Sequence, residues 1–187
     1  MSFPNRELRR QAPAFPTYFS TAVMARLANE GLRLALILAA ADTPAGLTLG
    51  GMLVAAFLIP SVVAAPFVGR LADMSAAPHR LYAVAFAFNG VVIALCGLLL
   101  GVAHPGVILL LAAAGGSVGP LLQGGLSSLV GAIVPAPLLP RAYALDVVTY
   151  NLSAILAPAI VAAIAGGVSP LASLLLLAML MLGAAAT

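Results

Sequence analysis

Six apolar runs, each about 20 residues or longer, fill nearly the whole chain and leave only short connections between them. Such a run is long enough to cross the hydrocarbon core of a bilayer as an α-helix. With 63% hydrophobic and 7% charged residues, the chain cannot cover the surface of a water-soluble fold. We predict an all-α membrane protein with a cytoplasmic N-terminal tail, 1–17, and a bundle of six transmembrane helices, 18–187. The predicted helices are Tyr18–Ala41, Leu47–Val68, Leu81–Val102, Gly106–Val134, Ala142–Ala165 and Pro170 to the end.

The arginines fall in alternate connections, and the chain contains no Lys. Six arginines lie in the N-terminal tail and in two of the connections, residues 69–80 and 135–141. They are Arg6, Arg9, Arg10, Arg70, Arg80 and Arg141. The opposite connections carry Asp42 and His104 instead. Positive charge marks the cytoplasmic side, so the N-terminus and the sixth helix end are predicted to be cytoplasmic. A nucleic-acid partner is not expected, because no basic face with interleaved aromatic residues is present.

Three charges interrupt the first apolar run, at Arg26, Glu30 and Arg33. Their spacing of four and three places them on one face of a helix. Each charge at mid-membrane costs about 2.5–3.5 kcal/mol on insertion scales, and such residues often mark transport pathways. Glu30 is the only acid within the body of a predicted span, so it is a candidate for protonation coupled to transport. Arg26 and Arg33 could bind an anionic group, and the alternative is a structural Arg–Glu–Arg ladder.

The connection "GRLADMSAAPHR" resembles a loop signature of the major facilitator superfamily, in its expected place between helices two and three. Gly69, Leu71 and Asp73 match the signature, and Arg80 stands for a later basic position, whereas Met74, Ala76 and Pro78 depart from it. The resemblance implies a cytoplasmic gate that links two halves of a transporter. Its predicted residues are Gly69, Arg70, Asp73, Arg80 and Asp146, with Asp146 paired to Arg70 or Arg80. The alternatives are a loop that merely orients the helices and an Asp146 stabilised by a helix N-terminus.

Two further stretches resemble signatures of the same family. "LLQGGLSSL" fits the fourth-helix signature at Gln123 and Gly124, but Pro120 stands where that signature has an arginine linked to proton coupling. "NLSAILAPAIVAAIAGG" fits the fifth-helix signature of exporters at Pro158, with small residues Ser153, Ala157 and Ala162. Gln123 and Asn151 are predicted to join the substrate and proton pathway. Small residues and prolines are predicted to set close helix packing, at Gly115, Gly119, Pro120, Gly124 and Pro158.

The resemblance implies the N-terminal half of a secondary transporter in the bacterial plasma membrane, exporting a small molecule in exchange for protons. Its partners would be the lipid bilayer, the small-molecule substrate, protons or another coupling ion, and the C-terminal half. The family has about twelve spans, so the sequence is expected to be a fragment; a half-size protein working as a dimer is the alternative.

Two other functions were weighed against transport. A membrane scaffold or assembly subunit fits the same composition. "GGSVG" matches the nucleophile pattern of serine hydrolases at Ser117, as in an intramembrane protease. Both histidines, His79 and His104, lie in loops before Ser117, where neither can activate its hydroxyl. An enzyme, a cofactor and a metal site are therefore not expected.

Overall fold

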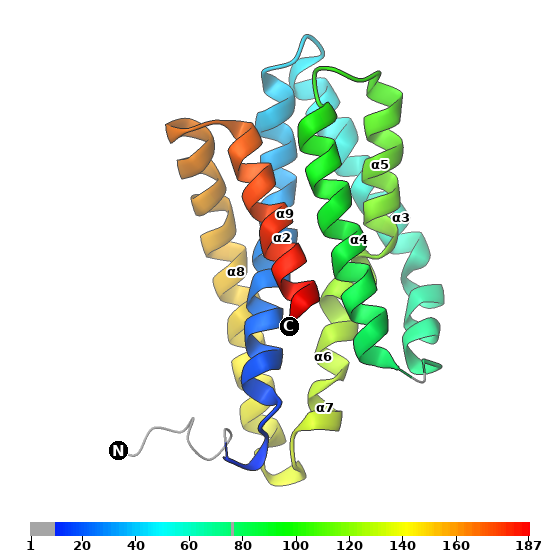
Figure 1. Ribbon diagram of the computed structural model, residues 1–187, viewed down its shortest axis with the longest axis vertical. Helices are drawn as coiled ribbons and strands as arrows, with labels where there is room; N and C mark the ends of the chain where they lie inside the picture. The colour runs from blue at the N-terminus through cyan, green and yellow to red at the C-terminus, as the bar shows by residue number, and fades with distance from the viewer. Residues whose placement is uncertain (1–9, 76) are drawn as a thin grey trace.

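The computed structural model describes residues 10–75 and 77–187, with only the backbone of Asp73, and arranges their helices as six antiparallel rods (Figure 1). Five rods are single helices: α2 (Phe15–Ala41), α3 (Gly46–Asp73), α4 (Pro78–Leu99), α8 (Leu139–Gly167) and α9 (Pro170–Ala186). The fourth rod is broken into α5 (Pro105–Ser117), η1 (Leu121–Gly125), α6 (Leu126–Ser128) and α7 (Val130–Ile133), and a short turn, η2 (Ala136–Leu138), leads to α8. The predicted six-helix architecture is confirmed.

Length and hydropathy single out four stretches of the described chain that could each cross a membrane. They are Gly46–Ala72, Pro78–Leu99, Pro105–Ile133 and Ala136–Gly167. Helix α9 is equally apolar but has 17 residues. Helix α2 is long enough at 27 residues and is not among the four, because Arg26, Glu30 and Arg33 lower its hydropathy.

Several helices begin earlier than the sequence predicted, because a proline occupies their first turn. Proline has no N–H to lose there, and its fixed φ suits the start of a helix. Helix α8 starts at Leu139, with Pro140 in its first turn, rather than at Ala142. Asp146 therefore lies about two turns inside α8, where the helix N-terminus no longer stabilises a carboxylate.

The end of α3 also differs from the predicted boundary. This helix runs on to Asp73, five residues beyond the predicted Val68, and includes both Pro60 and Pro66. Gly69 and Arg70 thus belong to the last turns of a helix and not to a loop.

The fourth rod breaks where glycine and proline are dense. Pro120 has no backbone N–H to donate, so α5 ends at Ser117 and the chain resumes as a π-helical turn, η1. The amide of Leu126 closes that turn by donating to the carbonyl of Leu121. The helix of this span is therefore interrupted over residues 118–125 and again at Leu129.

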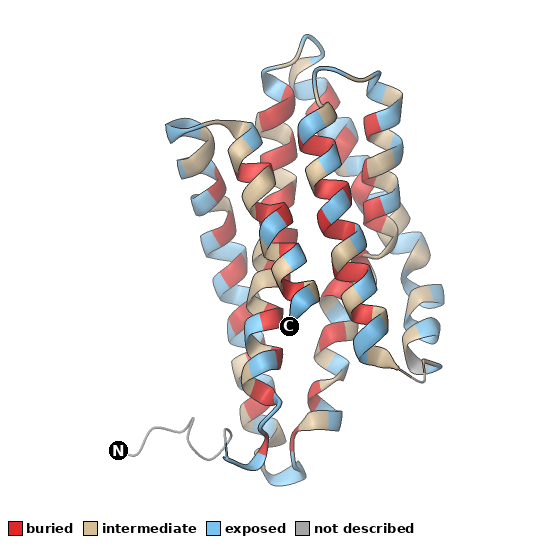
Figure 2. Cartoon of the chain, viewed as in Figure 1, coloured by how far each residue is buried: buried red, intermediate tan, exposed pale blue. Residues whose placement is uncertain are grey.

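The core forms where α2 and α4 pack against α8, α9 and the broken rod, while α3 lies at one flank and α8 at the other (Figures 1 and 2). Only 11% of the apolar window of α3 and 22% of that of α8 is buried, against 50% for α4. The flanking helices therefore offer apolar faces to lipid or to other protein.

Two glycines of α5 and a third just after it, Gly119, lie in close contact with α3 and α4. A Cβ on Gly116 would overlap the carbonyl oxygen of Phe57 on α3, so the two backbones touch. A Cβ on Gly115 would lie 2.9 Å from Val92 of α4, and one on Gly119 would lie 2.7 Å from the hydroxyl of Ser61. Gly115 and Gly119 thus sit at the contacts predicted for them.

Candidate functional site

The polar side chains of α2 meet the broken rod and α8 in two separate clusters. Helix α2 and the segment from η1 to α6 run antiparallel, which places Arg26 beside Ser127 and Glu30 beside Gln123. On each of the two segments the paired residues are four apart, which is about one helical turn. The charges of α2 therefore do not form a single Arg–Glu–Arg ladder.

The first cluster is a buried ion pair between α2 and α8. The Nη1 atom of Arg26 lies 2.8 Å from Oδ1 of Asp146, and the two residues are 1% and 3% exposed. The guanidinium also donates to the backbone carbonyl of Asp146 at 2.9 Å and to the hydroxyl of Thr149. Its Nη2 donates to the hydroxyl of Ser127 at 2.9 Å.

Other side chains complete this cluster around the carboxylate and the guanidinium. The hydroxyl of Tyr18 donates to Oδ1 of Asp146 at 2.5 Å, and that of Ser127 donates to Oδ2 at 2.8 Å. The ring of Tyr150 lies 3.6 Å from the guanidinium carbon of Arg26, a cation–π contact. A buried ion pair is tolerated when most of its remaining donors and acceptors are satisfied in this way.

This geometry differs from two sequence predictions. Asp146 pairs with Arg26 and not with Arg70 or Arg80, because it lies two turns inside α8 and faces α2. Glu30 is therefore not the only acid within a span. Arg26 is sealed by its partners, so it is not placed to receive an anionic substrate group.

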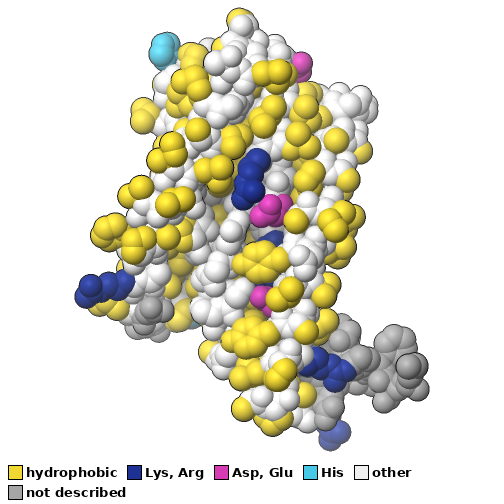
Figure 3. Space-filling model, turned by 180° about the vertical axis from the view of Figure 1, so that it is seen from behind, with side chains coloured by type: hydrophobic (Ala, Val, Ile, Leu, Met, Phe, Trp, Pro, Cys, Tyr) yellow, Lys and Arg dark blue, Asp and Glu magenta, His cyan; other side chains and the backbone are white. Residues whose placement is uncertain are grey.

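The second cluster, Glu30 with Arg33 and Gln123, is looser and more open. Glu30 Oε2 lies 3.6 Å from Nη1 of Arg33, and its Oε1 accepts from Gln123 at 3.4 Å. The side chain of Arg33 is 41% exposed and that of Glu30 is 21% exposed. Figure 3 shows blue and magenta side chains along the middle of one face, surrounded there by yellow and white. Both contacts are longer than the ion pair and the hydrogen bonds of the first cluster.

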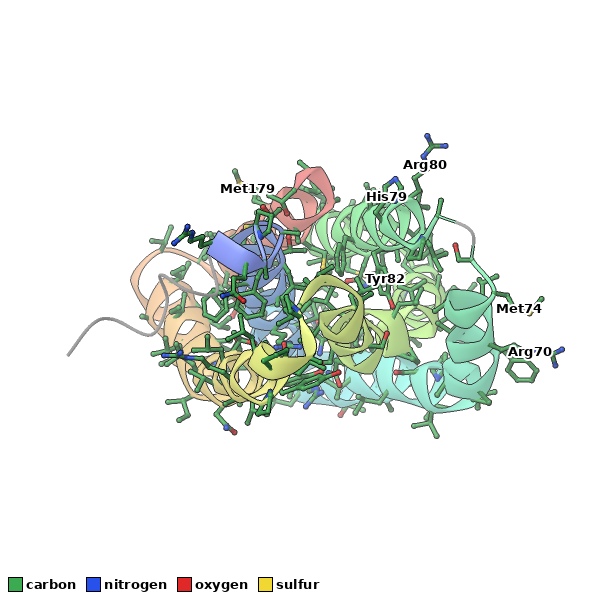
Figure 4. The ribbon with its side chains drawn as sticks, turned by 90° about the horizontal axis from the view of Figure 1, so that it is seen from below. Arg70, Met74, His79, Arg80, Tyr82 and Met179 are labelled. Carbon is green, nitrogen blue, oxygen red and sulfur yellow. The ribbon has the colours of Figure 1, made fainter. Side chains whose placement is uncertain are left out.

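The predicted gate residues lie at the end of the bundle that also carries the beginning of α2. In Figure 4, Arg70 and Arg80 both point outward, away from the helices. Gly69 is exposed, and a Cβ there would meet no atom within 4 Å, so it does not serve close helix approach. The side chain of Asp73 lies outside the described residues, as do Arg6 and Arg9.

The remaining predicted residues divide between packing and surface positions. On α8, Ser153 and Ala157 are buried, whereas Asn151 and Ala162 are exposed and Pro158 is intermediate. Gly124 is not a packing position, because a Cβ there would meet no atom within 4 Å. Its neighbour Gly125 faces the hydroxyl of Tyr82 instead.

The hydrolase-like pattern around Ser117 serves helix structure. The hydroxyl of Ser117 donates to the carbonyl of Ala114 at 2.7 Å, and the flanking glycines hold the contacts of α5. Among the described residues, no group of three or more His, Cys, Asp or Glu side chains could hold a metal ion.

Sequence reasoning missed three polar residues that the structure makes important. Tyr18 and Ser127 both bind Asp146, and Asn89 on α4 donates to the carbonyl of Gly115 on α5 at 2.9 Å. A single polar residue within an apolar run could have indicated a buried hydrogen bond, and Asn89 is the clearest example of the three. Spacing alone does not reveal which helix faces such a residue.

A cavity of about 480 Å³ opens between α2, α4, the end of the broken rod and α9. Its lining is mostly apolar, with Tyr18, Thr21 and His79 among the polar residues. Tyr82, which also lines it, points into the bundle in Figure 4.

Comparison with known proteins supports the pattern of spans. The chain is 30% identical over 181 residues to a protein of Sinorhizobium fredii described as an uncharacterized MFS-type transporter. The match includes 94% of this chain and 44% of the relative. The chain is a homologue of this major facilitator superfamily protein. It spans less than half the length of that relative, as one six-helix half would. No protein-family model and no solved structure matches the chain.

Proposed function

We propose that the chain forms one six-helix half of a secondary transporter that exports a small molecule across the bacterial plasma membrane by alternating access. The described cytoplasmic charges would be Arg10, Arg70, Arg80 and Arg141, all at the end of the bundle where α2 begins. Homology to the MFS-type relative supports membrane transport, and the outward orientation of Arg70 and Arg80 suits contact with a second half or with lipid headgroups.

The observation that carries the proposal is the open cluster of Glu30, Arg33 and Gln123. Glu30 lies roughly 22 Å along an α2 that is about 40 Å long, at 1.5 Å per residue, so it is near mid-membrane. An ionisable residue at that depth marks a transport pathway more often than a structural contact. Its contacts of 3.4 and 3.6 Å are weak enough to break without unfolding the bundle.

Proton coupling follows from the chemistry of this cluster. A proton added to the Glu30 carboxylate removes the charge that holds Arg33, so the guanidinium is released toward the open face. Arg33 then becomes available to an anionic group of a substrate, and loss of the proton restores the ion pair. The cation beside Glu30 is Arg33, and the position of the arginine in the fourth-helix signature is Pro120.

The test is flux in proteoliposomes that contain the protein translated from the whole gene, including any coding sequence downstream of Thr187. A pH gradient is imposed, and the movement of ethidium, a cation, and fluorescein, an anion, is followed. Gradient-driven flux that a protonophore abolishes supports the proposal. Absence of flux for both probes, in a protein that inserts normally, favours the scaffold or assembly subunit.

A further inference from the structure

Helix α2 is the least apolar of the long rods, yet it lies at the centre of the bundle. It contacts α3, α8 and α9, and about half of its residues are buried. Among the described stretches that could cross a membrane by their own length and hydropathy, α2 is absent and α8 is present. Its own hydropathy therefore favours insertion less than that of α8 does.

The charge count shows what is missing from α2. Within the helix, Glu30 pairs with Arg33, three residues away. Arg26 is then the remaining positive charge of α2, and its ion-pair partner is Asp146 on α8, a helix whose other charge is Arg141 near its start. The two cancel only when α2 and α8 lie side by side, as they do here.

Every acceptor that the structure shows for Arg26 comes from a segment translated much later. Ser127, Asp146 and Thr149 follow it by 101, 120 and 123 residues, and the ring of Tyr150 stacks on it as well. A guanidinium buried in lipid without these partners would be unsatisfied, at a cost of about 2.5–3.5 kcal/mol on insertion scales.

We infer that α2 becomes a stable transmembrane helix only after α8 has entered the membrane, and that Asp146 is the residue that holds it there. Asp146 is then an assembly determinant for the first span and not part of a cytoplasmic gate. This role does not depend on whether the protein transports anything.

A single-cysteine reporter tests the inference. The chain has one cysteine, Cys96, which is buried and can be removed as Cys96→Ala. Ala45→Cys then places an exposed thiol in the α2–α3 connection, for labelling in membrane vesicles with an impermeant maleimide. A second reporter, Val102→Cys, reads the α4–α5 connection at the same end of the bundle (Figure 1). In the parent both thiols should label from the same side.

The decisive variant is Asp146→Asn, which keeps the shape of the side chain and removes its charge. We expect labelling of the thiol at position 45 to fall at least threefold, while labelling of the thiol at position 102 stays at the parent level. Ser153→Ala, a buried position on the same helix, is the control and should label as the parent does. Unchanged labelling at position 45 in Asp146→Asn overturns the inference.

A double variant covers the case in which Asp146→Asn is degraded before it can be labelled. Arg26→Leu with Asp146→Leu removes both charges, so α2 should insert by its own hydrophobicity. Recovery of abundance and of labelling at position 45 to near the parent level supports the inference. Failure of the double variant to recover overturns it, because unpaired charge would then not be the cause.

Discussion

Arg26 and Glu30 lie one turn apart on α2 and end in different surroundings. Arg26 faces α8, where the carboxylate of Asp146, the hydroxyl of Thr149 and the ring of Tyr150 contact it, and it also binds the hydroxyl of Ser127 on α6. Glu30 faces the π-helical turn and the open face, where it keeps only two long contacts. The difference follows from the partner helix, since α8 carries Asp146 and η1 carries the neutral Gln123.

The open position of Glu30 leads to a prediction about coupling. Glu30→Gln should abolish pH-driven flux and keep exchange of substrate across the membrane, because the neutral amide cannot carry a proton through the cycle. Both activities are measured in proteoliposomes with the same labelled substrate. Asp42→Asn, which removes an acid from an exposed connection, is the control and should retain both.

Three outcomes distinguish a role of Glu30 in proton coupling from a structural role and from no role in coupling. Loss of driven flux alone agrees with a coupling role. Loss of folding, seen as aggregation in detergent, would favour a structural role for the Glu30–Arg33 pair. Full driven flux in the variant would show that protons are coupled elsewhere.

Gly116 gives a prediction about stability. A methyl group there would overlap the carbonyl oxygen of Phe57, which is backbone and cannot rotate away. Gly116→Ala should therefore cost about 1–3 kcal/mol, as overpacked cores do. The midpoint of thermal unfolding in detergent should fall by roughly 3–10 °C.

Gly51→Ala is the matched control, because Gly51 is exposed inside α3 and a Cβ there meets no atom within 4 Å. Alanine favours helix over glycine, so the control should keep or slightly raise the midpoint. Equal losses in the two variants would contradict the close approach of α3 and α5.

The sequence predicted which residues of α2 share a face, but it did not predict their partners. Helical spacing fixes neighbours within a helix, so the Arg33–Glu30 pair was within reach of that reasoning. The Arg26–Asp146 pair joins residues 120 positions apart, and nothing local indicates it. The same limit applies to glycine: Gly116 and Gly124 look equivalent in sequence, yet only one meets a neighbouring backbone.

At the scale of elements, proline explains most differences between predicted and observed boundaries. Hydropathy locates each span but not its first turn. A proline such as Pro16 or Pro140 allows the helix to begin before the apolar run starts. The break in the fourth rod was partly predictable, because Pro120 and the glycines around it disfavour a continuous helix. The π-helical form of η1 was not.

The α3–α4 connection carries the gate prediction. Asp73→Asn, at the α3 end of this connection, should reduce transport and leave insertion intact, because the helix end loses a charge while the side chain keeps its shape. Flux in proteoliposomes and abundance in membranes are compared with the parent. Ser75→Ala, in the same connection, is the control. Unchanged flux in Asp73→Asn would leave this segment as an anchor that only orients the helices.

At the scale of the molecule, the alternation of the rods turns the arginine pattern into a topology prediction. Residue 77 is expected to lie on the cytoplasmic side and residue 42 on the opposite side. Green fluorescent protein should therefore fluoresce when it is fused after Ala77, and alkaline phosphatase should be active when it is fused after Asp42. Alkaline phosphatase, active outside the cytoplasm, and green fluorescent protein, fluorescent inside it, give complementary readings. The reverse pattern at both positions would overturn the assignment.

The backbone contact at Gly116 restricts how the bundle can deform. Side chains between two helices change rotamer on fast timescales and absorb small shifts, but none separates α3 from α5 at this point. The two helices therefore have little room to shift toward each other at this point. The strain of any tilt falls on the next segment of the chain, residues 118–125, where the hydrogen-bond ladder is already interrupted. Close packing at Gly116 is thus followed, four residues later, by the helix interruption at Pro120.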